Sequence, residues 1–371
     1  MNDRAALGQL LDRGPMTRTQ LGRTTGLSGP TTSQVVERLT RRGLVREAGH
    51  AAGSRGPNAV VYQACTDQAR GVAVHIRGAR AEAQVVDAAG TAYPIAAVRL
   101  TAKPRTALTD LTTTIAAACA AAGLEPAAIG TVCVGVPGAV SRDTDHLRFA
   151  DDLPGWPRHF VRAQLESGLA MTVLIENDAV LAGVAEARTT GDDADFALFW
   201  QGEGLRVAPV AAGQVHRGTA GGAGEIGYLA APHTVTALDP QVTDLQSLAG
   251  SVGVTRLVRS HYPATRTYAA ALARLADPQS RPALLADLAP RIVETLIPVI
   301  AVLDPARIVW SGPTGAACGP EGAALVAAYL RRTTRWRTPI VATAVPTHPV
   351  LTGAAWTVTH HLAEALLGRI T

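Results

Sequence analysis

Apolar residues near the N-terminus recur at helical spacing in three short blocks, separated by glycine and proline. The first block predicts a helix over 4–13. The second predicts a helix over 18–25, which Thr17 can cap. The third predicts a helix over about 30–42, with Ser28 as a suitable cap. Three short helices joined by tight turns are therefore expected.

An extended segment follows the third helix. It starts at Gly43-Leu44-Val45, passes through the glycine-rich run AGHAAGSRGPNA and continues as VVYQA, a pattern that predicts a β-hairpin. Helices followed by a hairpin, in this order, predict a winged helix-turn-helix DNA-binding domain over residues 1–63. The alternative is a three-helix bundle used for protein contact.

From about residue 69 the pattern changes to apolar strands alternating with helices. We expect strands over 69–76, 81–88, 91–100, 129–136, 171–177, 195–200, 206–217, 307–312 and 338–345. We expect helices over 107–122, 178–190, several segments up to about 303, 320–334 and 350–367. Strands followed by alternating helices and strands occur twice, which predicts two related α/β lobes with a cleft between them.

Residues 69–371 are expected to form one domain, the body, which consists of these two lobes. Lobe one is assigned to about 69–190 together with the C-terminal helix, and lobe two to about 191–350. Ligands of such sheets bind outside the carboxyl ends of the strands, so the cleft is the expected ligand site.

Charge separates the two parts of the chain. The whole chain carries +4, whereas residues 1–61 contain nine arginines and four acidic residues, a net +5. A basic head on a nearly neutral body suggests a polyanion-binding module, here double-stranded DNA. The residues expected to contact bases or phosphates are Arg18, Ser28, Thr31, Thr32, Gln34, Arg38, Arg41 and Arg55.

Composition excludes several classes. No uninterrupted run of about 18 apolar residues exists, so no membrane span is expected, and the N-terminus does not read as a signal peptide. The four cysteines lie far apart without a CxxC pair, which argues against a disulfide framework. We therefore expect a cytoplasmic protein.

The run GPMTRTQLGRTTGLSGPTTSQVVERLTRRGLVREAG resembles the N-terminal DNA-binding domain of the ROK family (repressors, open reading frames and sugar kinases). Two departures concern the choice of DNA sequence. Gly29 stands where family repressors often carry arginine, and SRGPN in the wing is a scrambled form of the usual Gly-Arg-Pro.

The resemblance continues over most of residues 70–368. The runs that carry it are VGVPGAVS, LPGW, ENDA, RGTAGGAGEIGYL and LDPARIVWSG. Together they imply a two-lobe actin-like ATPase fold, also described as hexokinase-like or ribonuclease H-like. The resemblance places Asp178 at the position of the kinase catalytic base, although Asp178 is also a good residue to cap the helix that starts there.

Both phosphate loops depart from the family pattern. The first reads His75-Ile76-Arg77-Gly78-Ala79, where the family has Asp-x-Gly-Gly-Thr, and the second is interrupted by Arg206 and Pro209. Bound ATP and Mg²⁺ are therefore not expected, and no cofactor is assigned. Arg77 and Arg206 are expected to be surface or structural residues, with direct anion binding as the alternative. The family's zinc ligands are also missing, so no metal site is expected.

The residues at the family's sugar-binding positions are partly retained. Carboxylates and amides that converge in a cleft suit a polyhydroxylated ligand. The resemblance implies ligand contacts from Asp152, Asn177, Asp178, Glu225 and Tyr228.

These features predict a transcriptional regulator that acts as a repressor and whose kinase-like body has lost catalysis and senses a sugar or related small polar effector. A homodimer or homotetramer would present the DNA-binding heads. The alternatives are an ATP-dependent sugar kinase that retains a DNA-binding head, and a constitutive regulator without a ligand.

Overall fold

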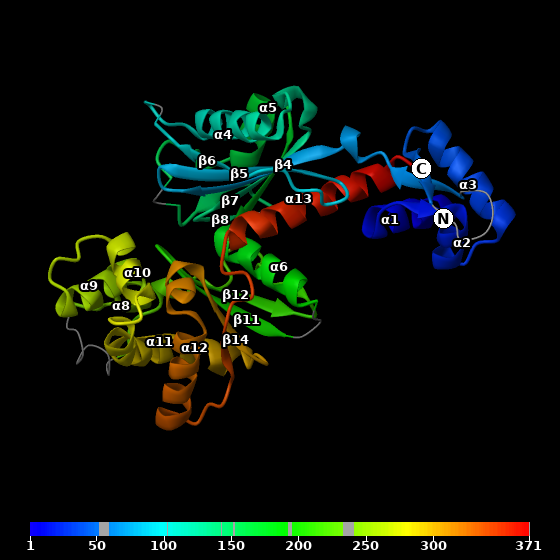
Figure 1. Ribbon diagram of the computed structural model, residues 1–371. Helices are drawn as coiled ribbons and strands as arrows, with labels where there is room; N and C mark the ends of the chain where they lie inside the picture. Colours follow the sequence, from blue (N-terminus) through cyan, green and yellow to red (C-terminus); the bar gives the residue numbers. More distant parts are fainter. Residues whose placement is uncertain are drawn as a thin grey trace.

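The computed structural model describes residues 1–51, 59–101, 103–141, 143–150, 153–191, 195–232 and 241–370. The head lies at one side of lobe one, and lobe two lies below lobe one in the view of Figure 1. No helix among the described residues is both long and apolar enough to cross a membrane.

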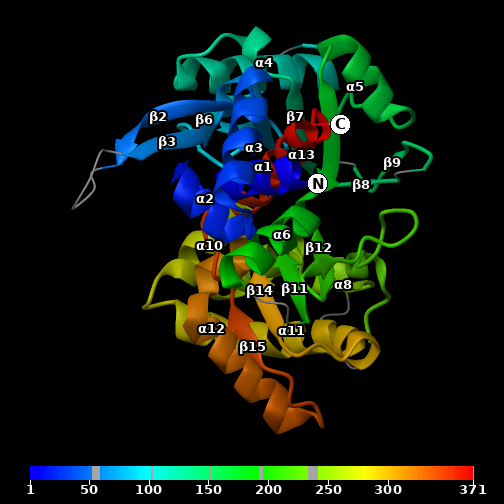
Figure 2. The same cartoon turned by 90° about the vertical axis from the view of Figure 1, so that its right-hand side faces the viewer.

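The head is a winged helix-turn-helix, as expected. Its elements are α1 (Asn2–Arg13), β1 (Met16–Thr17), α2 (Arg18–Thr25), α3 (Gly29–Arg41), β2 (Val45–Ala51) and β3 (Ala59–Ala64). Thr17 and Gln20 form a capping box at the start of α2, and Gly26 ends that helix at a φ of 71°. Strand β3 lies between β1 and β2, so it joins the start of α2 to the wing. Figure 2 shows β2 and β3 extending away from the three helices.

Lobe one is a five-stranded sheet covered by helices on both faces. Its strands are β4 (Arg70–Arg77), β5 (Arg80–Asp87), β6 (Ala96–Arg99), β7 (Thr131–Val136) and β10 (Thr172–Asn177), in the order β10-β7-β4-β5-β6. Helices α4 (Ala107–Ala122) and α5 (Val161–Leu169) cover one face, and α13 (Pro349–Gly368) covers the other (Figure 1). A small ribbon of β8 (Ala139–Val140) and β9 (Leu147–Arg148) lies beside the sheet, and η1 (Thr66–Gln68) and η2 (Pro126–Ala128) are single turns.

Lobe two repeats this plan. Its strands are β11 (Phe196–Gln201), β12 (Leu205–Ala211), β13 (Gln214–Val215), β14 (Ile308–Ser311) and β15 (Ile340–Ala342), in the order β13-β12-β11-β14-β15. In lobe one, β4 pairs antiparallel with β5 and parallel with β7. In lobe two, β11 pairs in the same way, antiparallel with β12 and parallel with β14. Helix α6 (Asp178–Thr190) lies between the lobes and packs on β12. The expected two related lobes are therefore confirmed.

The remaining helices of lobe two cover the other face of its sheet. They are η3 (Ile226–Tyr228), α8 (Leu245–Ala249), α9 (Ser251–His261), α10 (Tyr268–Ala276), α11 (Arg281–Leu303) and α12 (Gly312–Thr333). Helix α12 starts eight residues before the expected 320–334, and its backbone is kinked at Gly319, where φ is 62°. The glycine- and proline-rich run before Pro320 resembles a loop in sequence, but it continues directly from the buried strand β14.

Helix α13 connects the parts of the molecule. It starts beside the lobe interface, crosses the sheet of lobe one and ends against the head (Figure 1). At the head, Glu364 pairs with Arg4 at 2.5 Å, and Arg42 Nη1 donates to the carbonyl oxygen of Ile370 at 2.5 Å. The apolar side chains of the head and of α13 form one continuous buried cluster.

Gly353 allows α13 to approach α6. A Cβ atom added to Gly353 would lie 1.9 Å from the carbonyl oxygen of Leu181, a distance that requires backbone movement. Gly353→Ala should therefore destabilise the protein by about 1–3 kcal/mol, as overpacking does. Urea unfolding followed by circular dichroism measures this loss.

The matched control is Gly8→Ala in α1, where an added Cβ would meet nothing within 4 Å. That change should stabilise by about 0.5–1 kcal/mol, because alanine is favoured over glycine inside a helix. Equal effects of the two substitutions would contradict the close packing of α13.

Candidate DNA-binding head and interlobe sites

The exposed side of α3 is the candidate DNA surface. Gln34, Glu37 and Arg41 are exposed and follow one another at helical spacing, while Val35, Val36 and Leu39 face the core. The Ser28 hydroxyl caps the helix by accepting from the Thr31 N–H at 3.4 Å, and it lies 2.8 Å from the Thr31 hydroxyl. Both hydroxyls therefore lie at the N-terminal end of α3, which in a winged helix points into the major groove.

Thr32 does not belong to this surface. Its side chain is buried, and its hydroxyl donates to the carbonyl oxygen of Ser28 at 2.9 Å. It faces α2, where a Cβ atom at Gly22 would lie 3.1 Å from the Thr32 hydroxyl oxygen. The expectation that Thr32 contacts a base is therefore wrong, because its position on α3 turns it inward.

The arginines of the head differ in their surroundings. Arg38 forms a two-bond ion pair with Asp3 of α1, with Nη2–Oδ1 at 2.6 Å and Nε–Oδ2 at 3.0 Å. Arg38 holds the pKa of Asp3 below its ordinary value, mainly through this hydrogen bonding. The guanidinium of Arg18 lies over the ring of Tyr62, 5.0 Å from its centre. Arg41 is exposed, and Arg55 lies outside the described residues.

At the lobe interface, Asn177 caps α6. Its Oδ1 accepts from the N–H groups of Ala179 and Val180 at 2.8 and 3.3 Å, and its Nδ2 donates to the carbonyl oxygen of Gly138 at 2.9 Å. The side chain is buried with these internal partners. Asn177 therefore supplies the helix cap that the sequence also allowed for Asp178, and a ligand contact from its amide stays a prediction.

Arg206 occupies the space between the two retained acids. From β12, its Nη1 lies 3.1 Å from Asp178 Oδ1 and its Nε lies 2.9 Å from Glu225 Oε2. The side chains of Arg206, Asp178 and Glu225 are only 8%, 12% and 11% exposed. Burial raises the pKa of Glu225, although Arg206 beside it acts in the opposite direction. Arg206 is thus a structural residue that joins α6 to lobe two.

The other two expected ligand residues lie elsewhere. Tyr228 is 63% exposed, and its ring packs on that of Phe149 with 5.1 Å between the ring centres. Asp152 lies outside the described residues. The structure therefore brings Asp178 and Glu225 together, but around the side chain of Arg206, and it leaves Tyr228 exposed.

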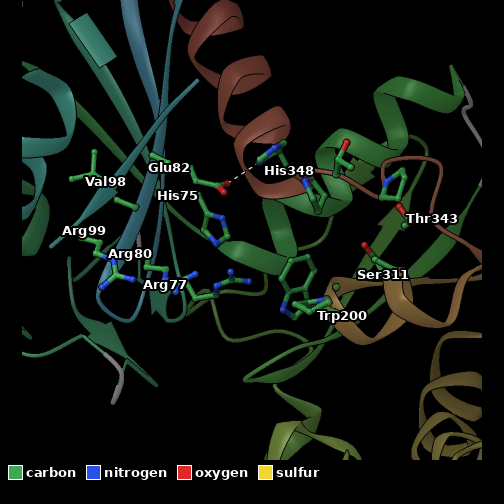
Figure 3. Close-up of a pocket in the computed structure, with 18 residues that line it drawn as sticks. His75, Arg77, Arg80, Glu82, Val98, Arg99, Trp200, Ser311, Thr343 and His348 are labelled. Carbon is green, nitrogen blue, oxygen red and sulfur yellow. Dashed lines mark hydrogen bonds and ion pairs between the residues drawn. The ribbon is translucent and has the colours of Figure 1, made fainter. Parts of the chain in front are cut away.

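A separate cavity of about 670 Å³ opens between the lobes, and none of Arg206, Asp178 and Glu225 is among its lining residues. His75 and Glu82 from lobe one face Trp200 and Ser311 from lobe two across it (Figure 3). His348, directly before α13, closes one edge through a 2.8 Å contact between its Nδ1 and Glu82 Oε2. Burial lowers the pKa of His75 to about 4, so its ring is neutral near pH 7.

Residues 71–360 match the ROK family, and residues 3–56 match the MarR family. The ROK match spans most of the chain. This protein belongs to the ROK family. No match was found among the curated proteins.

Solved structures with a similar fold include both regulators and kinases. A ROK family transcriptional regulator, described as a homolog of the E. coli MLC protein, matches with a TM-score of 0.71, 17% identity and 98% coverage of both chains. The ROK hexokinase from Thermus thermophilus matches 80% of this chain and 99% of its own, with a TM-score of 0.61 and 21% identity. A ROK family glucokinase from Streptomyces griseus, in complex with glucose and AMPPNP, matches 78% of this chain and 98% of its own, with a TM-score of 0.60 and 20% identity.

These matches confirm the fold expected from the sequence, a winged helix followed by a two-lobe ROK body. Sequence reasoning missed two features of this ROK protein, the buried ion pairs of Arg206 and the presence of Arg80 and Arg99 in the cavity wall. The interruption of the second phosphate loop was the only signal for Arg206. Within the described residues, no group of three or more His, Cys, Asp or Glu side chains is placed to hold a metal ion.

Removing the Arg206 side chain should leave two buried carboxylates without a counter-charge. Arg206→Ala should therefore destabilise this ROK protein by about 3–5 kcal/mol, the usual cost of breaking a buried ion pair from one side. The unfolding midpoint in urea at pH 7 gives the measurement.

The matched control is Arg335→Ala. Arg335 follows α12 on the surface, and its loss should change stability by no more than about 0.5 kcal/mol. A loss of less than about 1 kcal/mol in Arg206→Ala, measured on the same scale, would argue against the buried network.

Proposed function

We propose that this protein is a DNA-binding transcriptional regulator, and specifically a repressor, with α3 as the recognition helix. The observation that carries the proposal is the exposed side of α3, where Gln34 and Arg41 are presented by a winged helix with net charge +5 over residues 1–61. Major-groove recognition needs such a helix, with amides or hydroxyls for base edges and arginines for phosphates.

The contacts divide by position. Gln34, with the hydroxyls of Ser28 and Thr31 near the start of α3, would read base edges. Arg41, Arg18 and Arg55 would neutralise phosphates. Arg38 would contribute less, because Asp3 already occupies its guanidinium group.

A symmetric dimer, or a tetramer built from dimers, would hold two heads at a spacing of about 34–36 Å, one turn of DNA, or at a multiple of it. Sensing requires that ligand binding in the body alters the placement of the heads. A ligand does this only through different affinities for the two arrangements.

Helix α13 supports such coupling. The residues directly before and at its start, His348 and Pro349, line the interlobe cavity. Near its other end, Glu364 and the carbonyl oxygen of Ile370 hold Arg4 and Arg42 of the head. A change in lobe closure at the cavity would therefore move a helix that contacts the DNA-binding domain directly.

The DNA contacts are tested with the full chain, because truncating the head would expose the apolar cluster that it shares with α13. Genome-wide mapping of bound DNA supplies the operator. Gln34→Ala should then weaken operator binding by about 1–3 kcal/mol and relax preference at one base pair. Arg41→Ala should weaken binding to all sequences alike and reduce the salt dependence.

Titrations of operator and scrambled DNA at several salt concentrations distinguish the two effects. Arg335→Ala is the control and should bind as the wild type does. Unchanged operator affinity in both head variants would rule out α3 as the recognition helix.

A sugar kinase with an added DNA-binding head is the second candidate. The position of Asp178 at the start of α6, beside the lobe interface, favours it. Against it, Asp178 is held in an ion pair by Arg206, and the first phosphate turn carries His75 and Arg77 in place of an acid and a glycine.

We expect no phosphorylated product when the protein is incubated with Mg-ATP and a panel of hexoses and amino sugars. The assay separates products by mass and uses a reaction without protein as the background. Turnover above that background, lost in Asp178→Ala, would establish the kinase and refute a purely regulatory body.

A further inference from the structure

Three arginines lie next to one another on the lobe-one wall of the cavity. Arg77 of β4 is the register partner of Arg80 of β5, and Arg80 is the register partner of Arg99 of β6. Directly paired residues of antiparallel strands project from the same face of a sheet. All three side chains line the cavity, and Figure 3 shows them grouped on one side of it.

No carboxylate of the described residues is paired with this group. No hydrogen bond or ion pair joins any of the three guanidinium groups to another residue within the described part of the chain. Among the described residues that line the cavity, Glu82 is the only carboxylate, and its Oε2 contacts His348. Like charges placed directly across neighbouring strands destabilise a sheet. The arrangement therefore carries a cost that an anion bound in the cavity would offset.

The opposite wall provides a second, independent feature. Ser311 is completely buried, and among the residues that the structure describes its hydroxyl has no hydrogen-bond partner. It directly precedes α12, whose first part, before the break at Gly319, lines the cavity through Gly312 and Pro313. Figure 3 shows the Ser311 side chain directed toward the cavity. An unpaired buried hydroxyl is costly, and a polar ligand group in the cavity would offset that cost.

We propose that the cavity binds a phosphorylated small molecule, without a metal ion, with its phosphoryl group on Arg77, Arg80 and Arg99 and its remainder reaching toward Ser311. Guanidinium groups bind phosphate oxygens in pairs, which suits this cluster better than it suits a neutral sugar. The volume of about 670 Å³ falls within the range of small-molecule sites. The carboxylate of Glu82 in the described lining is already paired with His348, so the arginines are the groups on this wall that can balance a phosphoryl charge.

This inference rests on the proposed function, since it identifies the effector class of the regulator. The effector would be recognised by its negative charge in the cavity, because Arg206 already pairs with the carboxylates of Asp178 and Glu225. A ligand that spans the cavity would touch both lobes and the start of α13, where His348 and Pro349 also line the wall.

Calorimetric titration of the full chain in EDTA tests the site with four probes: glucose 6-phosphate, ATP, inorganic phosphate and unphosphorylated glucose. At least one phosphorylated probe should bind and glucose should not. The stronger of glucose 6-phosphate and ATP identifies whether a sugar phosphate or a nucleotide is the better source of the phosphoryl group. Failure of all three phosphorylated probes to bind would overturn the proposal.

Substitutions in the arginine cluster should lower the affinity for the phosphorylated probe without lowering the stability of the ligand-free protein. Arg80→Gln and Arg99→Gln should each weaken the bound phosphorylated probe at least about tenfold, the effect of losing one charge-assisted hydrogen bond. The Tm of the ligand-free protein should stay equal or rise, because charge repulsion is reduced. Arg335→Gln, the control, should change neither. Unchanged affinity in the double variant R80Q/R99Q would overturn the site.

The same probes added to the protein–operator complex separate this site from the proposed function. Release of DNA by the bound probe, absent in R80Q/R99Q, supports both. Calorimetric binding without any effect on DNA supports the site and contradicts its role as the regulatory effector site. Gln34→Ala should bind the probe as the wild type does, so loss of DNA binding cannot be mistaken for loss of the cavity.

Discussion

The positions of the other parts of the molecule depend on the close packing of α13 on lobe one. Gly71 and Gly135 on the sheet would clash with Val358 and Val350 of α13 if either carried a Cβ atom, and Gly353 meets the backbone of α6 in the same way. Side chains at these points would hold the helix away from the sheet. Because a helix of 20 residues is about 30 Å long, α13 can cover the sheet and still reach the head. The cavity and the DNA-binding domain are therefore joined by one continuous helix.

The Arg206 cluster imposes a second constraint, this time between the lobes. Asp178 belongs to α6 of lobe one, whereas Arg206 and Glu225 belong to lobe two, so the buried Arg206–Asp178 ion pair crosses the interface. Arg206 also approaches the carbonyl oxygen of Phe149 in lobe one at 3.5 Å. Opening the lobes would separate these charges. In a buried environment that separation is costly unless water or a ligand replaces the lost partners. The retained acids thus have a structural use that differs from binding a sugar.

Local signals account for the parts of the fold that sequence reasoning anticipated. Thr17 and Ser28 cap the helices of the head where expected, because capping depends on residues within one turn. The strands of the two sheets were expected from apolar runs that are buried on both faces. Helix α12 was anticipated only in its second half, since its first turns contain glycine and proline, whose usual preference is for loops. In the ENDA segment the sequence suggested Asp178 as a cap, whereas the structure has Asn177 in that position and Asp178 as the first residue of α6.

The sequence by itself determined the element types, the basic charge of the head and the resemblance to ROK proteins, because these follow from local periodicity, composition and short motifs. Tertiary structure decided which polar residues are available to a ligand. Thr32 turned inward because of its angular position on a packed helix. Arg206 met Asp178 and Glu225 from a different strand, and strand register placed Arg99 beside Arg80, nineteen residues away in the chain. Such contacts depend on how distant segments align in space, and no local pattern in the sequence encodes that alignment.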